Sequence, residues 1–103
     1  MLVVTRYRVD AGERQAFVSR AAAALAALAE RPGFLAGDVG RNVDDDGLFT
    51  LTTRWRDTGS YRRALGGFDV KTTAVPLLSL ALDEPTAYEV LVEQSASASG
   101  DAE

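Results

Sequence analysis

The side chains best suited to chemistry in this sequence are an indole and a phenol six residues apart, Trp55 and Tyr61. Alternation at period two up to the indole predicts a β-strand with four side chains on one face: Phe49, Leu51, Thr53 and Trp55. A turn at residues 57–59 follows, and Ser60 opens a helical pattern. An indole at a strand end and a phenol at the start of the next helix are suited to form one wall of a pocket for a flat ligand.

The chain of 103 residues contains no histidine and no cysteine. Its length favours a single domain with one modest core. The lack of histidine removes the commonest general base, metal ligand and haem ligand, so we expect no metal site. The lack of cysteine excludes disulfide bonds and thiol chemistry, and no stretch has the length of a membrane span or the order of a signal peptide. These features predict a cytoplasmic protein.

Lysine and arginine number 11 and aspartate and glutamate number 15, which gives a formal net charge of −4. An acidic chain with one lysine and no basic run does not favour binding to nucleic acid or to an anionic membrane. Seven arginines surround the expected pocket strands: Arg6, Arg8, Arg41, Arg54, Arg56, Arg62 and Arg63. We interpret them as solvated or as paired with the aspartates at 44–46 and 57. The alternative is that one of them faces an anionic, phenolate-like ligand.

Three further segments have the pattern of strands: residues 2–9, 34–43 and 86–93. Asp10 and Glu13 have the spacing of a capping box at the start of a helix. That helix carries one apolar stripe, formed by Phe17, Ala21, Ala24 and Leu28. Proline and glycine at residues 31–33 end it. A second helical region, residues 60–82, is interrupted at residues 66–67 and contains Pro76, which predicts two short helices or one kinked helix.

Glycine and acidic residues mark the connections. The Asp-Gly pair at 46–47 predicts a hairpin turn with positive φ, and the aspartates before it indicate a solvated turn, because the downstream acid of a calcium-binding loop is missing. Gly37 and Gly40 indicate a bulge or a close approach within the second strand. We expect a folded domain over residues 1–93 and a disordered tail over residues 94–103, where nothing is available to bury.

The order strand, helix, strand, strand, helix, strand is that of the ferredoxin-like βαββαβ fold, an α+β fold. It has a four-stranded antiparallel sheet with helices on one face. The other face would leave an apolar patch exposed, and packing two such faces together predicts a homodimer. The pocket is expected between sheet and helices, opening near Trp55 and Tyr61. Further residues expected to contact a substrate there are Tyr7, Phe49, Leu51, Leu65 and Phe68.

Residues 2–92 resemble the antibiotic biosynthesis monooxygenase (ABM) family of dimeric α+β barrel proteins. The motifs that carry the resemblance are Val4-Thr5-Arg6-Tyr7, Arg31-Pro32-Gly33-Phe34, Trp55 and Ser60-Tyr61-Arg62-Arg63-Ala64-Leu65. The resemblance implies a monooxygenase, an oxidoreductase that uses O₂ and no cofactor. Its substrate would be an electron-rich aromatic small molecule, such as an anthrone of a polyketide pathway.

Such chemistry has a physical logic. Triplet oxygen reacts poorly with closed-shell molecules, so most enzymes delegate the reaction to a metal or a flavin. An electron-rich phenolate or carbanion supplies the electron itself, and the protein need only bind it dry and stabilise the developing negative charge. The resemblance places the family's pocket tryptophan at Trp55, its pocket tyrosine at Tyr61, and its strand asparagines at Thr5 in one branch and Leu51 in another. It therefore implies catalytic roles for Trp55, Tyr61 and Thr5, with Thr5 donating to the ionisable oxygen of the substrate.

A second class of function is open: a non-catalytic dimeric protein that binds a small molecule. Each residue also has a structural interpretation, in which Trp55 anchors the core, Tyr61 caps it and Thr5 is a β-branched strand residue. The single lysine, Lys71, is interpreted as a surface ammonium group instead of a base. The haem-degrading branch of the family is not favoured, because its helix positions fall near Ala64 and Ala74 and the chain has no histidine.

Overall fold

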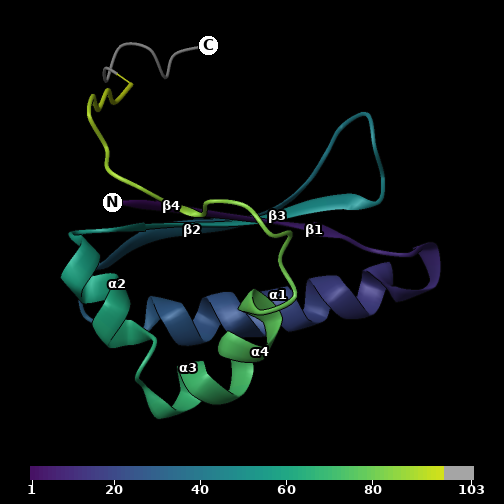
Figure 1. The fold of residues 1–103 in the computed structure, drawn as a ribbon, viewed down its shortest axis with the longest axis horizontal. Helices are drawn as coiled ribbons and strands as arrows, with labels where there is room; N and C mark the ends of the chain where they lie inside the picture. Colours follow the sequence, from purple (N-terminus) through teal and green to yellow (C-terminus); the bar gives the residue numbers. More distant parts are fainter. Residues whose placement is uncertain (97–103) are drawn as a thin grey trace.

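The protein forms a four-stranded antiparallel sheet with its helices packed on one side (Figure 1). The computed structural model describes residues 1–96. The strands are β1 (Leu2–Arg8), β2 (Phe34–Arg41), β3 (Leu48–Trp55) and β4 (Ala87–Tyr88), in the order β2-β3-β1-β4. A 3₁₀ turn, η1 (Ala11–Glu13), precedes the helices α1 (Arg14–Ala29), α2 (Thr58–Ala64), α3 (Phe68–Thr73) and α4 (Val75–Leu78). The predicted ferredoxin-like α+β fold is therefore confirmed. Within the described residues no helix is long and apolar enough to cross a membrane.

The two central strands, β1 and β3, turn mainly apolar and aromatic side chains toward the helices. In β3 the buried residues are those predicted from the alternation, Phe49, Leu51, Thr53 and Trp55. In β1 they are Val3, Thr5 and Tyr7. The register places Tyr7 beside Phe49 at one end of the pair and Val3 beside Thr53 toward the other. Tyr7 and Trp55 therefore lie at opposite ends of the same buried face.

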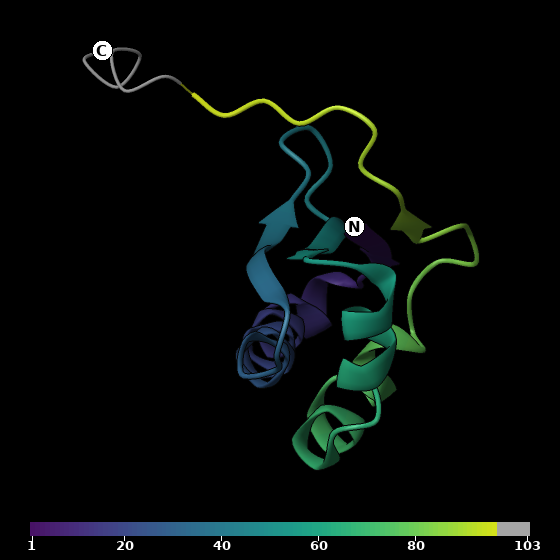
Figure 2. The same ribbon diagram turned by 90° about the vertical axis from the view of Figure 1, so that its left-hand side faces the viewer.

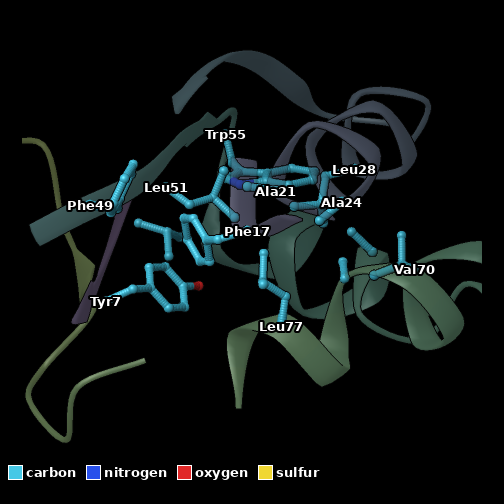
Figure 3. Close-up of a cluster of buried hydrophobic side chains, with 13 residues drawn as sticks. Tyr7, Phe17, Ala21, Ala24, Leu28, Phe49, Leu51, Trp55, Val70 and Leu77 are labelled. Carbon is cyan, nitrogen blue, oxygen red and sulfur yellow. The ribbon is translucent and has the colours of Figure 1, made fainter. Parts of the chain in front are cut away.

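Helix α1 lies close against this face. Its buried residues are those of the predicted stripe, Phe17, Ala21, Ala24 and Leu28. Alanine in the middle of the stripe lets the helix approach the sheet, and the rings and larger side chains complete a core that Figure 3 shows as one cluster. On β2, a Cβ at Gly37 would lie 2.5 Å from a methyl carbon of Leu25, so this glycine also permits the close approach. The expected bulge of β2 occurs instead between Phe34 and Ala36, where the register shifts.

The start of α1 differs from the expected capping box. The Asp10 side chain makes no capping hydrogen bond. The backbone of residues 10–13 forms a 3₁₀ turn in which the Glu13 N–H donates to the Asp10 carbonyl at 2.9 Å. Because of this turn the α-helix begins only at Arg14, and the Glu13 N–H is bonded to a backbone carbonyl instead of a capping side chain.

The second helical region consists of three short helices, where we expected one kinked helix or two. The break at Gly66 and Gly67 is present, between α2 and α3. Pro76 does not interrupt a helix, because it stands in the first turn of α4, where its missing N–H costs nothing. The chain instead divides α3 from α4 at Ala74.

The last strand is much shorter than the predicted residues 86–93. Only Ala87 and Tyr88 pair with β1, opposite Val3 and Leu2. Beyond Tyr88 the antiparallel partner strand has ended, so the chain leaves the sheet in an extended path, as Figure 2 shows. Most of the tail expected from residue 94 lies outside the described residues, and its disorder stays a prediction.

The turn between β2 and β3 is present but has no positive φ. Asn42 and Asp45 form it by accepting hydrogen bonds from the backbone N–H groups of Asp44 (2.8 Å) and Gly47 (3.0 Å). Within residues 1–96 the only positive φ belongs to Gly33, at 90°, in the connection from α1 to β2. This glycine lies directly against Ser60 of α2.

We expect Gly33→Ala to lower the free energy of unfolding by at least about 2 kcal/mol, because it adds strain at positive φ to overpacking. The new Cβ would lie 2.4 Å from the Cβ and Oγ of Ser60. Gly12→Ala is the matched control, since nothing lies within 4 Å of its Cβ position, and it should change stability by less than about 0.5 kcal/mol. Urea unfolding followed by tryptophan fluorescence measures both. Equal stability of the two variants would contradict the role assigned to Gly33.

Candidate active site

Trp55 is completely buried at the end of β3. The indole N–H donates to Thr53 Oγ1 at 2.9 Å. The Phe34 ring meets the indole edge-on with centroids 5.3 Å apart, and the Tyr61 ring lies against it at 5.6 Å. The indole is therefore a packed anchor whose single donor is already used. The predicted proximity of Trp55 and Tyr61 is present in the structure.

Helix α2 positions Tyr61. Its N-cap is Asp57, whose carboxylate accepts a 2.7 Å hydrogen bond from the Ser60 N–H, so the helix begins immediately after the turn that follows β3. Within residues 1–96 no protein group hydrogen-bonds the Tyr61 hydroxyl. Burial raises the pKa of this phenol, and the nearby Tyr7 phenol raises it further. Tyr61 therefore stays neutral at physiological pH and keeps a donor available.

Tyr7 lies at the other end of the buried face. Only 2% of it is exposed, and its hydroxyl lies 2.9 Å from Thr5 Oγ1. Thr5 in turn donates to the Leu51 carbonyl at 3.1 Å, so the Tyr7 hydroxyl is the donor to Thr5. Burial raises the pKa of Tyr7. Figure 3 shows the Tyr7 hydroxyl pointing into the core cluster, toward Leu77.

Besides Thr53, whose hydroxyl accepts from the indole N–H, three side chains bring hydroxyl groups to the layer between sheet and helices: Thr5, Tyr7 and Tyr61. We call them the hydroxyl cluster. Neutral phenols in a low-dielectric interior can donate hydrogen bonds to an oxygen that acquires negative charge. They cannot act as a base near neutral pH, because their pKa values lie above the ordinary value for tyrosine. Within residues 1–96 no group of three acidic side chains is placed to hold a metal ion.

The other residues expected to contact substrate are distributed unevenly. Phe49 and Leu51 are buried beside Tyr7 and Thr5 on the neighbouring strand, and Leu65 packs on the core from its edge. Phe68 is 78% exposed and does not join the group. Phe68 is the first residue of α3, beyond the break at Gly66 and Gly67, so it belongs to a different helix from Tyr61. Phe17 is in the core as predicted, and its ring also packs on Tyr7 at 4.9 Å, a contact that no local pattern indicates.

The arginines form mainly surface ion pairs. Arg8 pairs with Asp45 at 2.6 Å, as expected for an aspartate of the turn. Arg6 and Arg54 pair instead with glutamates, Glu84 at 2.7 Å and Glu93 at 2.9 Å. Such exposed pairs contribute little to stability. The pairs with Glu84 and Glu93 connect the last segment of the chain to β1 and β3.

A cleft of about 260 Å³ opens at the Tyr7 end of the sheet, between the end of β1, the start of α1 and the turn after α4. A second hollow, of about 350 Å³, lies near Met1, Arg54 and Leu91. Trp55 borders the second hollow, but since none of its surface is exposed a ligand there would not touch the indole. We expected the pocket to open near Trp55 and Tyr61, but the 260 Å³ cleft opens at the other end of the sheet, beside Tyr7.

The fold and its interior define a small ferredoxin-like α+β protein with hydroxyl groups set among aromatic rings. Residues 1–74 match the profile of the family described as antibiotic biosynthesis monooxygenase. The match covers more than half of the chain, and the chain belongs to this family. No curated protein sequence matches it significantly.

Solved structures agree with this assignment. SnoaB, a cofactor-independent oxygenase from Streptomyces nogalater, has 30% sequence identity and a TM-score of 0.69 over 89% of this chain and 96% of that chain. A protein from Deinococcus radiodurans has 18% identity and a TM-score of 0.74, over 94% and 99% of the two chains. A conserved protein from Methanosarcina mazei has 23% identity and a TM-score of 0.68, over 84% of each. The last two show similarity of fold alone.

The raised pKa values of Tyr7 and Tyr61 predict that the protein loses stability above about pH 10, the ordinary value for tyrosine. There the unfolded chain releases phenol protons before the folded protein does, so the free energy of unfolding falls as pH rises. For the buried Tyr7 the limiting slope is about 1.4 kcal/mol per pH unit.

Urea unfolding between pH 8 and about 11 measures this slope, the upper limit being set a unit above the tyrosine value. Tyr7→Phe should give a shallower dependence than the control Tyr88→Phe, whose ring is 47% exposed. The same slope in both variants would show that Tyr7 is not the group responsible.

Proposed function

We propose that the protein is a cofactor-independent monooxygenase that oxidises an electron-rich aromatic small molecule of the anthrone type with O₂. Membership of the antibiotic biosynthesis monooxygenase family and the similarity to SnoaB support the class of reaction. The observation that carries the proposal for this chain is the neutral Tyr61 hydroxyl beside the Trp55 ring, the one member of the hydroxyl cluster that makes no hydrogen bond within residues 1–96.

The reaction balances without a cofactor. The methylene carbon of an anthrone loses a proton, and the resulting anion spreads its charge between that carbon and the carbonyl oxygen. One electron passes to O₂, and the substrate radical and superoxide then combine in a carbon–oxygen bond. Cleavage of the O–O bond leaves one oxygen as the new carbonyl and releases the other with two hydrogens as water. Anthrone and O₂ therefore give anthraquinone and water.

Residues of this chain stabilise the negative charge that develops on the substrate oxygen. Tyr61 donates its free hydroxyl to the anionic oxygen of the substrate, which favours the deprotonated form and so the transfer of an electron. The Tyr7 hydroxyl, whose proton is donated to Thr5, is left to accept a hydrogen bond from a hydroxyl group of the substrate. Trp55 is a positioning residue, since its buried ring holds the Tyr61 ring in place. The proton leaves to solvent, because no group of the cluster is a base.

A non-catalytic binding protein is the second candidate. Leu51 stands where one branch of the family has a polar side chain, and the Trp55 N–H is bound internally. On this alternative the same interior binds an aromatic molecule and raises the stability of the protein without consuming O₂.

We further propose that the protein works as a cytoplasmic homodimer. The sheet face opposite the helices carries Leu2, Val4, Thr50 and Thr52, which are half-buried in the single chain. Ion pairs of Arg6 and Arg54 border this face. A second copy packed on it would cover apolar area that water otherwise contacts.

Oxygen consumption with dithranol, a dihydroxyanthrone, tests the reaction. We expect turnover to the quinone, and a fall in kcat of about 100-fold in Tyr61→Phe, as for the loss of one donor to a developing oxyanion. Tyr88→Phe is the control and should retain wild-type kcat, because Tyr88 lies outside the cluster. Unchanged kcat in Tyr61→Phe would remove the role assigned to Tyr61. Stabilisation by the aromatic compound without oxygen uptake would favour the second candidate.

Light scattering after size exclusion tests the dimer. We expect a mass of twice the 11.0 kDa of one chain. Val4→Asp should dissociate the dimer, because it places a charge in the covered face, whereas Val43→Asp in the exposed turn should not. A wild-type protein that remains monomeric at high concentration would contradict the dimer.

A further inference from the structure

We propose that the 260 Å³ cleft at the Tyr7 end is the substrate site, and that it takes a flat, uncharged, hydroxylated aromatic molecule. This inference rests on the proposed function and adds the place of entry and the preference for an uncharged ligand. It also moves the site from the Trp55 end, where the sequence led us to expect the opening, to the other end of the sheet.

The floor of the cleft is aromatic. Tyr7 and Phe17 both line it, and their rings pack against each other with centroids 4.9 Å apart at 52°. These residues are almost buried, at 2% and 7% exposure, so the little surface they retain is available to a ligand in the cleft. Aromatic faces and edges are good partners for a planar ring system.

Tyr7 connects the cleft to the interior. It lines the cleft, and its hydroxyl bonds Thr5 within the core. A ligand that enters over Tyr7 therefore approaches the linked hydroxyls of Tyr7 and Thr5.

The opposite end is closed. Trp55 has no exposed surface, and Phe34 and Tyr61 lie against its ring. The N-terminal amine of Met1 donates to the Trp55 carbonyl at 3.0 Å, which fixes the first residue of the chain across this end. The Tyr7 end is thus the accessible route to the cluster.

Two apolar residues form the walls. Ala16 of α1 contributes a small side chain on one side, and Leu80 contributes a large one from the turn after α4. Leu80 is 59% exposed, although hydrogen bonds fix the backbone of its turn. The Leu80 N–H donates to the Leu77 carbonyl, and the Leu82 N–H donates to the Arg6 carbonyl. A bound ring system would cover it.

The charges around the mouth balance. Arg8 and Arg20 face Asp10 and Glu13 there, two of each sign. Arg8 is engaged by Asp45 from outside the cleft, and the nearby Arg14 donates its Nε–H to the Val9 carbonyl. A mouth with no excess of positive charge does not favour a carboxylated ligand, whereas hydroxyl groups can bond to side chains of either sign.

The experiment uses danthron, a neutral dihydroxyanthraquinone, and rhein, the same ring system with a carboxylate. Ala16→Leu fills the cleft, and Ala23→Leu adds the same side chain elsewhere on the exposed surface of α1. We expect Ala16→Leu to weaken danthron binding at least tenfold and Ala23→Leu to change it less than twofold. Rhein should bind the wild-type protein at least fivefold more weakly than danthron.

Equal binding of danthron by the two alanine variants, or no binding by the wild-type protein, would overturn the cleft as the site. Binding of rhein as tight as that of danthron would overturn the preference for an uncharged ligand. If Ala16→Leu does not fold, Leu80→Trp obstructs the cleft from the other wall and should give the same loss.

The failure of this inference is distinguishable from the failure of the proposed function. Dithranol oxidation with the same kcat/KM in Ala16→Leu and Ala23→Leu would leave the monooxygenase proposal standing and remove the cleft. Danthron binding that Ala16→Leu abolishes, in a protein that consumes no O₂ with dithranol, would leave the cleft standing and remove the reaction.

Discussion

The close contact between α1 and the sheet is the constraint on which the rest of the structure depends. Ala21 and Ala24 are fully buried at its centre, and Gly37 of β2 leaves room for Leu25. Small side chains in the middle bring the helix down onto β1 and β3, so bulky rings fit only toward the ends of the face. Phe17 and Tyr7 therefore meet at one end, and Trp55 with Tyr61 at the other.

That contact also determines the state of the hydroxyl groups. A phenol placed between a sheet and a helix loses water, which disfavours its anion, and so the pKa values of Tyr7 and Tyr61 rise. The cost of burying the hydroxyls is offset where they bond each other and the Leu51 carbonyl. The result is an interior that donates hydrogen bonds but does not take up protons, which is what a reaction driven by the substrate's own electrons requires.

As a consequence, the two ends of the layer between α1 and the sheet have different roles. At the Trp55 end the indole N–H is used, and the packing of Gly33 on Ser60 holds α2 against the sheet. At the Tyr7 end the 3₁₀ turn before α1 and the turn after α4 meet without filling the space between them. One end therefore gives rigidity and the other access, within a domain that has a single small core.

The sequence by itself determined the order of the elements, the buried faces of β1, β3 and α1, and the proximity of Trp55 to Tyr61. These follow from periodicity and short spacings, because a strand or a helix imposes them locally. Only the tertiary structure decided that β4 stops at Tyr88, that Phe68 turns outward, that Phe17 packs on Phe49, and that the 260 Å³ cleft lies at the Tyr7 end. Each of these depends on segments far apart in the chain, whose mutual positions are set by packing and by where a partner strand ends, and no local pattern records them.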